Sequence, residues 1–139
     1  MIKPFLLLQS RPEDEASDDE YAAFLKFGGL QPEQLQRLRL DRGGFSPVNL
    51  DDYSGIFMGG GPANFAYPPE EKSPEQLQFE DYIMPLLRRI AAEDKPFLGT
   101  CLGVGALVTA LGGRTDFDHG EPVCAVDINL TPEAQGDPL

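Results

Sequence analysis

A cysteine with a glycine two residues away on each side is the part of this sequence best suited to chemistry: Gly99-Thr100-Cys101-Leu102-Gly103. An apolar run that ends at Leu98 precedes it, and small and apolar residues follow it over 104–111. This order is typical of a strand, a sharp turn and a helix, in which glycines let the strand and helix backbones pass closely. A thiolate is favoured at a helix N-terminus. The pattern predicts a nucleophile elbow with Cys101 as the nucleophile; the alternative is a small buried residue that fills a helix–strand junction.

A second glycine cluster, Gly59-Gly60-Gly61-Pro62, follows the apolar segment Ile56-Phe57-Met58. Glycines at the carboxyl end of a strand let the backbone approach a ligand closely and direct N–H groups toward an anion. In an α/β sheet, ligands bind at the carboxyl ends of the strands. The two glycine clusters therefore predict a single site at the ends of two strands.

Together, segments 56–62 and 96–103 resemble the class I glutamine amidotransferases, in which one strand ends in Gly-Gly-Pro and another leads into Gly-x-Cys-x-Gly. The resemblance extends from the first strand to segment 121–130. It implies that Cys101 attacks the side-chain amide of glutamine, which releases ammonia and leaves a glutamyl thioester that water cleaves. It also implies an oxyanion hole made by the backbone N–H groups of Gly61 and Leu102, with Gly60 and Gly103 next to the substrate.

Two features depart from that family. The family commonly continues Cys-Leu-Gly-His-Gln, with the Gln touching the substrate, whereas this sequence has Val104 and Gly105 there. Family members also complete a triad with a His-x-Glu motif many tens of residues after the cysteine. The only histidine here, His119, lies in a polar segment typical of a solvated turn. We expect that turn at the amino edge of the sheet, opposite the Cys101 sulfur.

Residues 1–139 are therefore expected to form a single, incomplete amidotransferase-like domain, itself inactive because the triad His and Glu are absent; the alternative is a naturally short relative. Two other functions fit the same motifs. One is a non-catalytic or regulatory binding domain, and the other is a different cysteine hydrolase that cleaves a γ-glutamyl amide, an ester or a peptide. The expected ligand is a small molecule, glutamine or a related amide. A synthetase partner and a homo-oligomer are both left open.

Composition excludes several other classes. The formal net charge of −12 argues against nucleic acid or an anionic membrane as partner, because both need clustered Lys and Arg. No run approaches the ~20 apolar residues of a membrane span, and the N-terminus is too short for a signal peptide. Cys101 and Cys124 make no disulfide framework, so we expect reduced thiols in a cytoplasmic protein. No Cys and His cluster has metal-ligand spacing, and we expect no metal and no cofactor.

Strand and helix patterns alternate along the chain. Ser17 and Glu20 predict a capping box for a helix that Gly28-Gly29 ends, and Ser73 predicts the N-cap of a second helix that Pro85 kinks or splits. The acidic residues of 11–20 are most simply a solvated loop and helix start; their place after the first strand also leaves open that they flank the site. Strands are expected at 1–9, 38–40, 56–58, 96–98 and 123–130, with a helical turn at 32–37 and Cys124 in an apolar core position of the last strand.

This alternation predicts an α/β fold: a flavodoxin-like, mostly parallel sheet with helices on both faces, and a strand, nucleophile elbow and helix at 96–111. With 41% hydrophobic residues, a chain of 139 residues can bury a core of its own.

Overall fold

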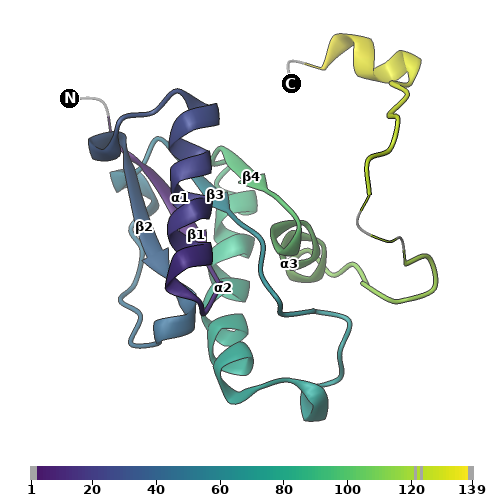
Figure 1. The fold of residues 1–139 in the computed structure, drawn as a ribbon, viewed down its shortest axis with the longest axis horizontal. Coiled ribbons are helices and arrows are strands. Elements are labelled where there is room, and N and C mark those ends of the chain that lie inside the picture. The colour runs from purple at the N-terminus through teal and green to yellow at the C-terminus, as the bar shows by residue number, and fades with distance from the viewer. Residues whose placement is uncertain (1–2, 121, 123, 138–139) are drawn as a thin grey trace.

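The computed structural model describes residues 3–120, 122 and 124–137. Parallel strands form one sheet in the order β2-β1-β3-β4 (Figure 1). Helices lie on both faces of this sheet, so the predicted α/β class is confirmed. The strands are β1 (Phe5–Gln9), β2 (Leu35–Arg39), β3 (Gly55–Met58) and β4 (Phe97–Gly99), and the α-helices are α1 (Asp14–Gly28), α2 (Pro74–Ala92) and α3 (Leu102–Ala110).

The two central strands supply two different layers, because successive side chains of a strand point to opposite faces. Leu8 and Met58 belong to the main buried cluster, which they share with residues of α2 and α3. Phe57 points to the other face, where its ring packs against Phe24 of α1 with a centroid distance of 5.2 Å. Figure 1 shows α1 in front of the sheet and α2 behind it.

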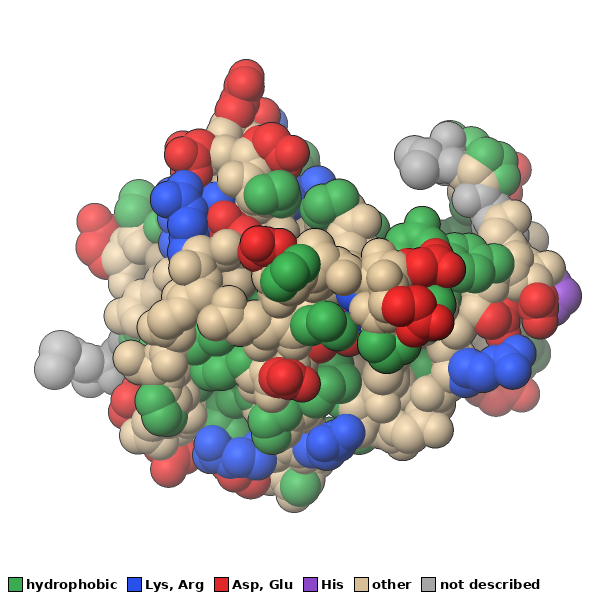
Figure 2. All heavy atoms as spheres, turned by 90° about the horizontal axis from the view of Figure 1, so that it is seen from below, with side chains coloured by type: hydrophobic (Ala, Val, Ile, Leu, Met, Phe, Trp, Pro, Cys, Tyr) green, Lys and Arg blue, Asp and Glu red, His purple; other side chains and the backbone are tan. Residues whose placement is uncertain are grey.

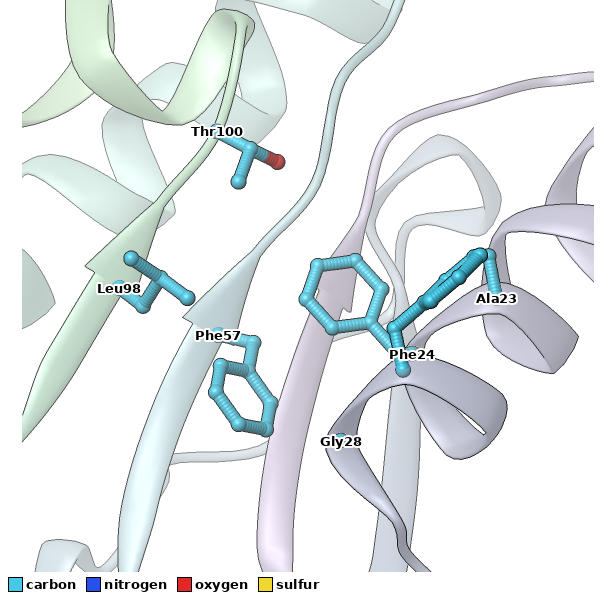
Figure 3. A pocket seen from close by; sticks show the side chains of 7 residues that line it. Ala23, Phe24, Gly28, Phe57, Leu98 and Thr100 are labelled. Carbon is cyan, nitrogen blue, oxygen red and sulfur yellow. The ribbon is translucent and has the colours of Figure 1, made fainter.

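An apolar groove runs along the α1 face of the sheet beside β4 (Figure 3). Its volume is about 360 Å³, and Phe24, Phe57 and Leu98 form much of its wall. Leu98 is 46% exposed and Phe27, at the end of α1, is 82% exposed. Thr100 lies at the end of the groove where β4 passes into the elbow, so this surface borders the predicted site.

Helix α1 starts earlier than the sequence predicts. Glu13 is its N-cap, and the acidic side chains of the first turn, Asp14 and Glu15, suit the positive end of the helix dipole. Ser17 is buried inside the helix, so the predicted capping box of Ser17 and Glu20 is wrong. The predicted C-terminal end is confirmed, because Gly29 takes the left-handed conformation after Gly28.

Two further elements differ from the sequence prediction. Strand β2 begins at Leu35, and only Pro32–Gln34 forms a 3-10 turn, because pairing with β1 extends over all of β2. Helix α2 runs without a break through Pro85, which is exposed, so the predicted split is wrong, while the alternative of a kink stays a prediction. Buried neighbours on both sides of the proline, Ile83 and Leu86, anchor the helix to the core and keep it in one piece.

The strand predicted at 123–130 is absent over 124–130, the described part of that range. Cys124 and Ile128 are exposed, so the predicted core position of Cys124 is wrong. Alternating apolar residues make a strand only where a neighbouring strand and an apolar face receive them. Here the segment runs away from the sheet and leads to a 3-10 helix at Pro132–Gly136 (Figure 1).

Candidate active site

The register of the sheet brings the predicted site together at its carboxyl edge. Leu8 pairs with Met58, and Met58 pairs with Gly99, so β1, β3 and β4 end side by side. The segments that follow these strands therefore meet at one place: residues 10–11, the glycine loop 59–61, and Thr100-Cys101. This is the end of the sheet at which ligands bind in α/β folds.

Cys101 has the backbone geometry of an elbow. It is the N-cap of α3, with φ 53° and ψ −109°, a region that a non-glycine residue rarely adopts. A Cβ on Gly99 would lie 2.7 Å from the carbonyl oxygen of Gly103, and a Cβ on Gly103 would lie 2.7 Å from that of Met58. Both glycines are thus needed for the close passage that the sequence predicts. Cys101 is exposed, which rules out the alternative of a buried filler.

The glycine loop 59–61 faces the elbow. The position that a Cβ on Gly60 would occupy is 3.2 Å from the Cys101 Sγ, and the corresponding position on Gly61 is 3.5 Å from Leu102. In the part of the chain that the structure describes, the N–H groups of Gly61 and Leu102 donate no hydrogen bond. The two segments that meet at Cys101 therefore each carry an unpaired backbone donor.

The partly buried carboxylate of Glu20 hydrogen-bonds to the glycine loop, a role that the sequence did not assign to it. Glu20 Oε1 accepts hydrogen bonds from the Gly60 N–H at 2.9 Å and from Arg11 Nε at 3.1 Å. Gln9 Nε2 donates to Glu20 Oε2 at 3.2 Å, and Ser10 Oγ donates to the Gly60 carbonyl oxygen at 3.2 Å. The Glu20 side chain is 10% exposed. The sequence leaves open that acidic residues after the first strand flank the site, and the contacts of Glu20 with the glycine loop agree with that alternative.

A cavity of about 210 Å³ opens beside the thiol. This is smaller than the roughly 300–1,000 Å³ of pockets for drug-sized ligands, so it suits a small molecule. Gly105 contributes no side chain, which leaves space where a longer residue would reach inward. The residues that line the cavity are Gly61, Ala63, Asn64, Phe65, Cys101, Leu102, Gly105 and Thr115.

The segment that carries His119 does not lie where we expected. Thr115 lines the cavity next to Cys101, and the Phe117 ring packs against Tyr67 of the loop after β3, with a centroid distance of 5.4 Å. The chain after α3 therefore returns to the carboxyl edge of the sheet. Helix α3 is short, and residues 112–115 run back along this helix. His119 is exposed, as predicted for a solvated turn. His119-Gly120-Glu121 has the spacing of a His-x-Glu motif, but Glu121 lies outside the described residues.

Charged side chains of both signs are interspersed on the face seen in Figure 2, which lacks one continuous basic surface among its described residues. Within the described ranges, no group of His, Cys, Asp and Glu side chains could hold a metal ion. None of the described helices is long and apolar enough to cross a membrane.

Comparison with known families identifies the family of this chain. The sequence model of the class-I glutamine amidotransferases matches residues 34–135, which include β3, the glycine loop, the elbow and α3. The chain belongs to the class I glutamine amidotransferase family. No curated protein matches the chain.

Solved structures agree with this family. A glutamine amidotransferase from Methylobacillus flagellatus is 28% identical, with a TM-score of 0.60 over 87% of this chain. A glutamine amidotransferase from Thermotoga maritima is 27% identical, with a TM-score of 0.54 over 81% of this chain. The alignments cover 44% of each of those two chains. The amidotransferase fold of this chain, a flavodoxin-like α/β sheet, is thereby established.

Proposed function

We propose that the whole protein uses Cys101 of this amidotransferase domain to hydrolyse the side-chain amide of glutamine, or of a closely related small amide, to the acid and ammonia. The observation that carries the proposal is the elbow geometry of Cys101 opposite the Gly60-Gly61 backbone, within the span that the family model matches. The small cavity beside the thiol provides the place for the amide.

In the first step, the Cys101 thiolate attacks the amide carbon, and the carbonyl oxygen takes the negative charge. We assign stabilisation of that oxyanion to the N–H groups of Gly61 and Leu102; such stabilisation is commonly the largest single contribution to acyl transfer. The C–N bond then breaks, the nitrogen takes a proton from solvent and leaves as ammonia, and a thioester forms on Cys101. Water adds to the thioester and returns one proton to solvent, the C–S bond breaks, and the carboxylic acid leaves with the thiolate restored.

Ammonia released at this edge of the sheet needs an acceptor, and we propose that a synthetase partner or a second domain supplies it. The chain spans less than half the length of the two amidotransferases it matches, so acceptor and partner are proposals for the whole protein. The two alternatives, a binding domain without catalysis and a cysteine hydrolase for other γ-glutamyl compounds, use the same cavity. Covalent labelling with a glutamine analogue distinguishes glutamine from other γ-glutamyl ligands, and ammonia release by the whole protein distinguishes catalysis from binding alone.

A glutamine analogue with a diazoketone in place of the amide tests the proposal, because it alkylates a thiol only after binding as glutamine does. Peptide mapping should find the label on Cys101 and not on Cys124, and excess glutamine should slow the labelling. Cys101→Ser should abolish it, and Cys124→Ser should leave it unchanged. If iodoacetamide modifies Cys101 while the analogue does not, glutamine is not the ligand and the proposal fails.

A further inference from the structure

We propose that Arg11 forms a carboxylate-binding subsite beside Cys101, which selects amide substrates that carry a negative charge of their own. The identity of the ligand as an amide depends on the proposed function. The anion subsite itself does not, because its evidence is the position of one guanidinium group.

The side chains of Arg11 and Cys101 both lie close to Gly60 of the glycine loop. The position that a Cβ on Gly60 would occupy is 2.8 Å from Arg11 Nη2 and 3.2 Å from the Cys101 Sγ. A glycine at this position therefore leaves open a space that both the guanidinium and the thiol border. A ligand whose reactive carbon is at the sulfur comes within reach of the guanidinium.

The Arg11 guanidinium is paired through its Nε atom, and its two Nη atoms are left for a ligand. Its Nε is paired with Glu20 Oε1 at 3.1 Å, and Glu20 is in turn fixed by Gln9 and by the Gly60 N–H. Among the described residues, neither Nη atom has a hydrogen-bond partner, and the Arg11 side chain is 35% exposed. An arginine presents paired N–H groups in a planar fork that matches a carboxylate. The fork left open here is the one formed by the two Nη atoms.

The cavity beside the thiol supplies no cation of its own. Besides the Cys101 thiol, its lining has two polar side chains, Asn64 and Thr115, and otherwise backbone and apolar groups. A bound carboxylate buried without a cation would be unfavourable. Lys72, whose Nζ lies 5.7 Å from the centroid of the Phe65 ring, is paired with Glu80 at 2.8 Å. Arg11, near Gly60, is thus a positive group with both Nη atoms open to a charged substrate.

Two alkylating reagents of nearly the same size test the subsite. Iodoacetate carries a carboxylate and iodoacetamide does not, while both react with a thiolate and release iodide. Their rates at Cys101 would be measured by peptide mapping in the 139-residue chain and in Arg11→Gln. We expect the ratio of the iodoacetate rate to the iodoacetamide rate at Cys101 to fall about fivefold in Arg11→Gln, the size of a partly exposed charge interaction.

Two controls make the ratio specific. Arg89→Gln removes the same charge from the C-terminal part of α2, which leads to the amino edge of the sheet, and should leave the ratio unchanged. Cys124, exposed in the same molecule, is an internal reference whose ratio should not change in either variant. Arg11→Lys keeps the charge and should retain part of the preference for iodoacetate.

If Arg11 only favours the thiolate, both reagents slow equally in Arg11→Gln and the ratio is constant, which overturns the proposal. The same conclusion follows if Arg89→Gln lowers the ratio as much as Arg11→Gln does. Failure of the proposed glutamine chemistry is a separate result, because the diazoketone labelling can be absent while the iodoacetate preference is present.

Discussion

Gly103 and Gly105 are both helical glycines of α3, yet only one of them is required by its surroundings. A Cβ on Gly103 would lie 2.7 Å from the Met58 carbonyl oxygen, whereas the nearest atom to a Cβ on Gly105 is 3.5 Å away, an ordinary contact. The strand-to-helix junction thus requires a glycine at position 103, whereas Gly105 can be replaced.

We expect Gly103→Ala to lower the free energy of unfolding by about 2 kcal/mol, because rigid backbone must shift to admit the methyl group. Gly105→Ala, the matched control, should raise it by about 0.5–1 kcal/mol through helix propensity. Urea denaturation followed by circular dichroism measures both values. Equal effects of the two substitutions would contradict the close passage of α3 over β3.

Glu20 gives a second prediction for a single residue. Glu20→Ala leaves the Gly60 N–H, Arg11 Nε and Gln9 Nε2 without this acceptor, so the free energy of unfolding should fall by about 3 kcal/mol. Glu20→Gln keeps an oxygen acceptor and should cost about 1 kcal/mol. Asp19→Ala, at the exposed neighbouring position of α1, should change stability by less than about 0.5 kcal/mol. Similar losses in Glu20→Ala and Asp19→Ala would show that the buried network contributes little.

At the scale of elements, the sequence predicted the helices and turns whose ends are marked by residues with a strong conformational preference. Glycine, proline and serine at fixed positions predict the elbow, helix α3 and the helix that begins after Ser73. The structure contains all three of these elements. The start of α1 and the extent of β2 were wrong, because helix-dipole contacts and pairing with β1 decide them. Glu20 could not be assigned to the site from its sequence position alone, since its role depends on which helix turn faces the glycine loop.

An ion-pair cluster joins the first turn of α1 to the end of β2. Asp14 hydrogen-bonds with Arg39 at 2.9 Å and also with Arg42. These side-chain hydrogen bonds, first that of Arg39 and then that of Arg42, hold the pKa of Asp14 below its ordinary value of 3.8. A lowered folded-state pKa gives stability that is present at neutral pH and is lost as the pH falls through that value.

Asp14→Asn should therefore be less stable than the unmodified chain at neutral pH, with the difference shrinking as the pH falls below 3.8, the ordinary value. Urea midpoints for both chains between pH 7 and about pH 2 measure this. Asp14 is exposed, and solvent screening keeps the effect small. A difference that stays constant down to the lowest pH would show that the carboxylate charge is not its cause.

At the scale of the whole molecule, the sheet order and the two helix layers follow from the alternation of apolar strands and helices, which the sequence displays. The path of residues 112–137 does not follow from local pattern. Val126, Ile128 and Leu130 alternate as in a strand, but they are exposed, because pairing and burial need partners that no local pattern specifies. The same return of the chain brings Thr115 to the cavity, which local sequence also does not reveal.

The last prediction concerns catalysis by these 139 residues. Removing one member of a nucleophile and base pair typically costs several orders of magnitude in turnover, because the two act as a unit. The chain has Cys101 at an elbow, while its single histidine, His119, is exposed in a turn and makes no described contact with the thiol. We therefore expect negligible ammonia release from glutamine, although the diazoketone analogue still labels Cys101. His119→Ala should not change this result, and Cys101→Ser serves as the blank. Robust turnover that disappears in His119→Ala would instead make His119 the base, brought to the thiol by the return of the chain after α3.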